Sequence, residues 1–180
     1  MGIEGVFIGA VIINIEEATM KCGDELLRKA RTIADYQFGS GAGEALFPEH
    51  AEFEFILTRS GRMSQIKDKG NGMRIATLRS LDGLFTLGIA GAERLHRFLE
   101  YPRMRVVMND AVSEYIRAGG TAFCKHVIDV DPEIRAYDEV IVVDERDNLL
   151  ATGKAMLSPE EMRTFEHGVA VKVRYGVERG

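Results

Sequence analysis

The residues best suited to chemistry lie in the last third of the chain, around the adjacent glycines Gly119 and Gly120. A short helix is expected to run into these glycines, and the strand expected after them carries Phe123 and Lys125. Glycine allows positive φ angles, so consecutive glycines can present main-chain N–H groups to a bulky anion. This pattern predicts that the loop Gly119–Thr121 contacts a phosphate or the edge of a base.

A second group of candidate residues lies on the last expected strand. In the segment Gly168–Gly176, three valines alternate with Ala170, Lys172 and Arg174, so one strand face is apolar and the other carries cations. Lysine and arginine attract a sugar–phosphate backbone whatever its base sequence. We therefore interpret this part of the chain as a small β-barrel that holds an RNA backbone.

Apolar periodicity predicts the elements that position these residues. In the first half we expect strands at Phe53–Leu57, Met63–Ile66, Met73–Leu78 and Leu84–Leu87, flanked by helices Asp24–Tyr36 and Gly91–Glu100. In the second half we expect strands at Arg103–Met108, Phe123–Ile128, Glu139–Val143, Leu149–Met156 and Gly168–Gly176, a helix capped by Asn109 or Asp110, and a helix starting at Ser158.

The predicted fold class is α+β, with a small antiparallel sheet and flanking helices followed by a C-terminal β-barrel. Pro102 stops the preceding helix, so Tyr101–Pro102 is the expected junction. The predicted domains are residues 1–101 and residues 102–180.

The overall charge is not that of a general nucleic-acid binder. Lys and Arg number 23 against 28 Asp and Glu, which gives a net charge of −5, so any RNA contact must come from local clusters. One cluster lies between Phe55 and Leu81, where Asp68 is the only acid. Its cations are Arg59, Arg62, Lys67, Lys69, Arg74 and Arg79. The alternative is an ordinary solvated hairpin face.

The N-terminal run Gly5–Ile15 is apolar and rich in β-branched residues, which favours a buried strand and allows an interface with a second copy or another subunit. It is too short to span a membrane, and Glu4 is unlike the cationic start of a secretory signal. Met20 is an alternative start. With Cys22 and Cys124 as the only cysteines, we expect reduced thiols and a cytoplasmic protein.

Candidate catalytic and metal sites are weak. The cysteines and histidines lack metal-ligand spacing, and Cys124 with His126 lacks an orienting partner, so Cys124 is interpreted as a core residue. The acids of Asp129–Glu139 lack the spacing of a calcium loop, so a solvated turn is expected. We assign no catalytic residue, metal or cofactor.

The second half resembles a PUA domain, the small RNA-binding barrel of pseudouridine synthases and archaeosine tRNA-guanine transglycosylases. The resemblance is carried by Arg105–Met108, Asp110–Gly120, Phe123–Val127, Asp138–Val143, Leu149–Ala155 and Gly168–Val177. Upstream, Ala34–Gly39 and Ala76–Leu87 resemble the accessory domain that precedes PUA in those transglycosylases and in archaeosine synthases. The resemblance covers roughly residues 24 to 178.

The resemblance implies a tRNA-docking role, with the acceptor end as the bound element, and no counterpart of the family's catalytic domain. The residues that it places in the RNA groove are Arg105, Gly119, Gly120, Thr121, Phe123, Lys125, Lys154, Lys172 and Arg174. Phe123 is alternatively barrel core, Lys125 and Lys154 a solvated face, and Glu139 with Arg163 a structural ion pair. Charge reversal of Lys172 and Arg174 is expected to weaken RNA binding without harming the fold.

Three functions remain open at this level. The first is a non-catalytic protein that binds tRNA or another structured RNA, either as a free-standing protein or as the partner of a separately encoded catalytic subunit of the archaeosine pathway. The second is a stand-alone RNA-modifying enzyme. The third is a protein-interaction module, such as a homodimer.

Overall fold

Short amphipathic strands build the sheet of the first module. The computed structural model describes the backbone of residues 7–8, 11–12 and 15–179, and side chains from residue 23 to residue 179. The strands are β3 (Phe53–Leu57), β4 (Met63–Asp68), β5 (Arg74–Leu78) and β6 (Phe85–Leu87). They pair antiparallel in chain order, as predicted. The sheet packs with α1 (Ile15–Phe38), α2 (Ala42–Leu46) and α3 (Ile89–Phe98) around fully buried residues such as Leu46, Phe47, Ile66, Phe85 and Leu95.

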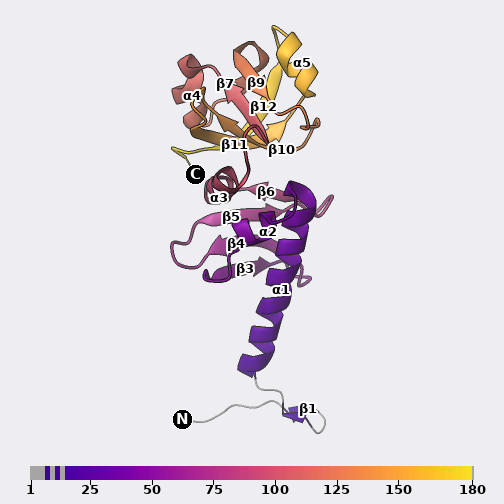
Figure 1. Cartoon of the computed structure of the whole chain (residues 1–180). Coiled ribbons are helices and arrows are strands. Elements are labelled where there is room, and N and C mark those ends of the chain that lie inside the picture. The colour runs from indigo at the N-terminus through magenta and orange to yellow at the C-terminus, as the bar shows by residue number, and fades with distance from the viewer. Residues whose placement is uncertain (1–6, 9–10, 13–14, 180) are drawn as a thin grey trace.

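The N-terminal part differs from the expectation. Helix α1 begins nine residues before the predicted start at Asp24, runs through Met20 and extends beyond the sheet (Figure 1). The single strand predicted over Gly5–Ile15 is absent from the described part of that run. There, β1 (Phe7–Ile8) and β2 (Val11–Ile12) pair antiparallel with each other. The rest of the run before Ile15 lies outside the described residues.

The second module is a nearly closed six-stranded barrel. Its strands are β7 (Arg105–Met108), β8 (Ala122–Phe123), β9 (Val127–Val130), β10 (Glu139–Val143), β11 (Leu149–Ala155) and β12 (Val169–Gly176), in the spatial order β8-β12-β11-β10-β7-β9. The helical segments are η1 (Asp110–Val112), α4 (Ser113–Arg117), η2 (Cys124–His126) and α5 (Pro159–Thr164). Ser158 and Glu161 form the expected capping box at α5, and Asn109 caps η1.

The prediction of one continuous strand over Phe123–Ile128 is wrong, and the interruption of this strand nearly closes the barrel. The 3-10 turn η2 interrupts it, so its first part, β8, pairs with β12, and its second part, β9, pairs with β7. The two edge strands of the sheet are therefore joined by a single turn. Apolar alternation cannot reveal such an interruption, because the pattern is preserved on both sides of it.

The two modules share a core. Val107, Ile141 and Val143 alternate with residues that point into the barrel, and they pack instead against the core of the first module with Met104. The acidic loop before β10 supports this junction, because the buried Asp131 accepts hydrogen bonds from the amides of Met104 (2.7 Å) and Glu133 (2.8 Å). Asp131 is therefore a structural residue and not part of a solvated turn.

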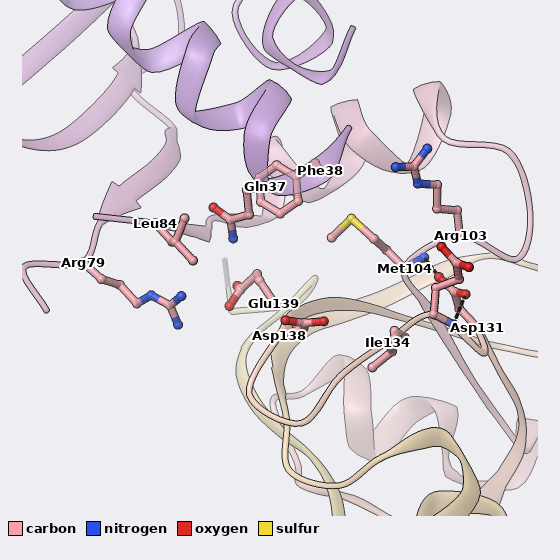
Figure 2. Close-up of a pocket in the computed structure, with 11 residues that line it drawn as sticks. Gln37, Phe38, Arg79, Leu84, Arg103, Met104, Asp131, Ile134, Asp138 and Glu139 are labelled. Atoms are coloured by element: carbon pink, nitrogen blue, oxygen red, sulfur yellow. Dashed lines mark hydrogen bonds between the residues drawn. The ribbon is translucent and has the colours of Figure 1, made fainter. Parts of the chain in front are cut away.

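Side chains cover the exposed edge of β6, which would otherwise carry unsatisfied backbone groups. The amide of Gln37 on α1 donates to the carbonyl of Phe85 (2.9 Å) and accepts from its N–H (2.7 Å), as a neighbouring strand would. Glu139 of the barrel accepts from the N–H of Leu87 (2.9 Å). Figure 2 shows Gln37 and Glu139 lining one pocket between the modules. The β6 edge of the first sheet is thus covered by α1 and by the barrel.

Candidate nucleic-acid interface

An outward-facing surface on three neighbouring barrel strands gathers several of the predicted residues. Ala122 of β8 and Val171 of β12 are register partners and are fully buried, so their neighbours Phe123 and Lys172 point outward. Lys172 faces Lys154 directly across the β11–β12 pair. We call Phe123, Lys154 and Lys172 the strand face. Phe123 is 38% exposed, so its interpretation as barrel core is wrong.

Two cations lie beside aromatic rings on or near the strand face. The ammonium of Lys154 lies 5.1 Å from the ring centroid of Tyr137, an exposed residue that the sequence did not single out. At the far end of β12, the guanidinium of Arg74 from the first module lies 4.1 Å from the ring centroid of Tyr175. Cations next to aromatic planes suit a ligand that offers both phosphates and bases.

Two predicted contacts are structural residues instead. Arg105 is 2% exposed, and its guanidinium binds Asp147 (3.0 Å) and the carbonyls of Arg103 (2.9 Å) and His96 (2.8 Å). It is therefore not available to RNA. A buried arginine and an exposed one look alike in a strand that opens a module, so the sequence could not distinguish them.

Arg174 is the second predicted RNA contact that has a structural role instead. Its guanidinium binds the carboxylate of Glu139, which is buried and also lies 3.3 Å from the hydroxyl of Thr152. The predicted pairing of Glu139 with Arg163 is wrong, since Arg163 pairs with Asp129 (2.8 Å). Burial raises the pKa of the Glu139 carboxyl above its ordinary value, although the charge of Arg174 opposes the shift. Reversing the charge of Arg174 would set two carboxylates against each other, so this variant is unsuitable as a test of RNA binding.

The amides of the glycine loop are occupied. The N–H of Gly119, which has φ +89°, donates to the carbonyl of Ile116 (2.8 Å), and the N–H of Gly120 donates to that of Tyr115 (2.9 Å). This pair of bonds is a Schellman motif that caps α4. The expectation that these amides bind phosphate or a base is therefore wrong: the glycines end the helix and direct the chain into β8.

Replacement of Gly119 by alanine tests this assignment. A side chain at φ +89° is strained, while the nearest atom to a new Cβ is Arg179 Cδ at 3.8 Å, so strain and not collision is expected. We expect a loss of about 1 kcal/mol in the free energy of unfolding, measured in urea, with RNA affinity within about twofold of wild type. A large loss of RNA affinity with unchanged stability would instead indicate that the glycine loop contacts the ligand.

The remaining predicted residues lie close to the strand face in the chain. Thr121 is half-buried between the glycines and β8, and Lys125 is exposed on the turn η2, not on a strand. Cys124, beside it, is buried, and burial raises the pKa of its thiol, as expected of a core residue.

The basic cluster of the first module divides between the two ends of its sheet. The β3–β4 and β5–β6 turns lie at one end of the meander and carry Arg59, Arg62 and Arg79, while Lys67, Lys69 and Arg74 lie near the β4–β5 turn at the other. The second end adjoins β12 through Arg74. In an antiparallel meander, alternate turns lie at the same end of the sheet. The order of the strands in the chain therefore predicts which basic residues lie at each end.

The described residues hold neither a candidate metal site nor a candidate membrane-spanning helix. Among these, no group of three His, Cys, Asp or Glu residues is placed to hold a metal ion. None of the described helices is long and apolar enough to cross a membrane.

Comparison with known families matches both modules. Residues 28–102 match the patch-forming domain C2 of tRNA-guanine transglycosylase, and residues 104–177 match the PUA domain. The tRNA-guanine(15) transglycosylase of Pyrococcus abyssi is 50% identical over 167 residues, which are 93% of this chain and 27% of the relative. That of Methanothermobacter thermautotrophicus is 46% identical over 151 residues, 83% of this chain and 22% of the relative. The chain thus spans about a quarter of the length of these relatives.

Solved structures show the same arrangement of elements. A hypothetical protein of Pyrococcus horikoshii superposes with a TM-score of 0.64 at 20% identity, over 84% of this chain and 90% of the other. A PUA domain protein of Thermoplasma acidophilum superposes with a TM-score of 0.57 at 16% identity, over 86% and 89%. At these identities the likeness establishes the fold alone.

Proposed function

Because the chain belongs to the C2 and PUA domain families found together in the C-terminal part of tRNA-guanine transglycosylases, we propose that it docks tRNA through the strand face of its barrel. The acceptor end is the proposed ligand. The proposed contacts are Phe123, Lys154 and Lys172, with Thr121 and Lys125 beside them.

The observation that carries this proposal is the register pairing of Lys154 with Lys172 beside an exposed phenylalanine. Like charges directly across a strand pair repel each other, so the pairing of Lys154 with Lys172 is unfavourable in the free protein, and only Lys154 has a carboxylate residue, Glu139, as its register partner on the other side. A polyanion relieves this repulsion, which makes the pair more favourable in a complex than in isolation. Of the aromatic residues on this side, Phe123 offers a ring for stacking of an unpaired base.

We assign docking, and not base exchange, to these residues. The curated relatives extend well beyond the matched region, so their catalytic groups need not lie in it. The strand face itself offers two cations and one aromatic ring, but no pair of carboxylates in different environments that could serve as general acid and general base. A catalytic partner or a further part of a longer protein would then supply the chemistry.

Titration of the purified chain with labelled tRNA at several salt concentrations tests the proposal. We expect affinity to fall linearly on a log–log plot against salt, with a slope near one per phosphate contact. Incubation with tRNA and labelled guanine should give no base exchange by the chain alone. Salt-independent binding would contradict the phosphate contacts, and turnover would overturn the docking role.

A further inference from the structure

We propose that the first module carries a second phosphate-binding site, in the groove between α1 and the β3–β4 and β5–β6 turns, for the backbone of the same tRNA at a distance from its 3′ tail. This inference rests on the proposed function, because it assumes that tRNA is the ligand. It adds a contact region separate from the strand face.

The antiparallel meander creates this groove. Because β3–β4 and β5–β6 turn at the same end of the sheet, Arg62 and Arg79 come together there, and α1 adds Lys29 from the side. The cavity is about 380 Å³ in volume. Thr58, Ser64 and Ser80 also line it and bring hydroxyl groups that can donate to phosphate oxygens.

The charge of the groove selects an anion. Among its lining residues are three cations and no carboxylate. Within the described part of the chain, Lys29 and Arg62 form no ion pair, and both side chains are exposed. Arg79 is held in place by Asp82, whose carboxylate oxygens lie 3.1 and 2.9 Å from its guanidinium nitrogens. After the pair of Arg79 with Asp82 is subtracted, the groove keeps two positive charges, those of Lys29 and Arg62.

The surroundings favour a nucleic acid over a small anion. Tyr36, which is 84% exposed, follows the groove residue Ile33 by one turn of α1, and Leu81, which is 95% exposed, lies on the β5–β6 turn. Exposed rings and apolar side chains beside cations are typical of surfaces that contact both backbone and bases. A free phosphate ion would use the cations and the hydroxyl groups but not these exposed apolar and aromatic side chains.

The distance between the two regions requires a long ligand. The groove lies at one end of β4 and Arg74, which contacts the barrel strand β12, lies near the other end. Strand β4 has six residues, which corresponds to about 20 Å at the usual rise. A mononucleotide cannot reach both, whereas a folded tRNA can contact the strand face with its acceptor end and the groove with its backbone.

Charge reversal at Lys29 and Arg62 tests the site. The variant K29E/R62E is expected to bind full-length tRNA about tenfold more weakly, with a salt slope lower by about two. It should bind a single-stranded oligonucleotide carrying the tRNA 3′ sequence as the wild type does. The matched control R97E/R146E makes the same change in net charge at exposed arginines outside the groove, and should leave both affinities within about twofold.

The outcomes separate this site from the strand face. Equal affinity of K29E/R62E and the control for tRNA would overturn the proposal, as would a parallel loss for the oligonucleotide. If titration with inorganic phosphate moves the amide NMR signals of the two turns while tRNA affinity is unchanged in K29E/R62E, the groove holds free phosphate only and the RNA proposal fails. If instead the strand face is not used, replacement of Lys154 and Lys172 by glutamate will leave the affinity for the oligonucleotide unchanged.

Discussion

Replacement of both Lys154 and Lys172 by glutamate will weaken tRNA binding roughly 100-fold at physiological salt and lower the salt slope by about two. The two side chains are direct register partners on the strand face. The variant removes the positive charge there and adds repulsion toward phosphate. Binding should be measured by titration with labelled tRNA over a series of salt concentrations.

The fold should survive this change. Lys172 is exposed, Lys154 is half-buried, and neither forms an ion pair among the described residues. Because Lys154 is also the register partner of Glu139 on β10, the new glutamate is expected to lower the urea midpoint slightly without loss of the fold. The control R97E/R146E again matches the change in net charge, and it should retain affinity. If K154E/K172E binds tRNA as tightly as this control, the strand face is not the docking surface.

Replacement of Glu139 by alanine will lower the free energy of unfolding by about 3 to 5 kcal/mol. The carboxylate binds Arg174, accepts from the N–H of Leu87 (2.9 Å) and lies near the hydroxyl of Thr152 (3.3 Å), so its loss leaves several polar groups without their partner. Because Leu87 belongs to the first module, the contact between modules is also weakened. Urea unfolding followed by circular dichroism measures the loss.

Two variants make the Glu139 result specific. Glu178→Ala breaks the exposed pair with Arg117 (3.2 Å) and should cost no more than about 1 kcal/mol. Glu139→Gln keeps an acceptor for the N–H of Leu87 and removes only the charge, so it should be less harmful than alanine. If Glu139→Ala costs no more than Glu178→Ala, then the buried carboxylate does not hold the modules together.

The same residue predicts a pH dependence. Burial raises the pKa of Glu139 in the folded state, so the folded protein holds its proton at pH values where the unfolded chain has lost it. The unfolded state then binds fewer protons, and stability falls as pH rises from the ordinary glutamate pKa through the folded-state value. Relative to Glu139→Gln, the wild type should lose stability over that interval and become constant above it. An opposite slope would mean that Arg174 outweighs burial.

Local sequence signals were sufficient for most elements. The alternation in Phe53–Leu57 and Gly168–Gly176, the capping box at Ser158 and the glycine after α4 all depend on residues a few positions apart. Such signals act through backbone geometry that neighbouring residues impose. The family resemblance and the two-module order were visible for the same reason.

The environment of the candidate site residues could not be predicted from the sequence. Arg105, Lys154, Lys172 and Arg174 all read as cations on strands, and only their surroundings separate them. Arg105 and Arg174 meet Asp147 and Glu139 from positions 42 and 35 residues away. Whether a cation is free for a ligand depends on these long-range partners, which no local pattern encodes.

By itself, the sequence determined the α+β class, the order of a sheet module and a barrel, and the family, because each is written in short-range periodicity and turn residues. Only the tertiary structure decided which cations face solvent, that the amides of the glycine loop cap a helix, and that the two modules share a core. Burial and hydrogen-bond partners arise from contacts between residues far apart in the chain, and their energies exceed the local preferences that the sequence displays.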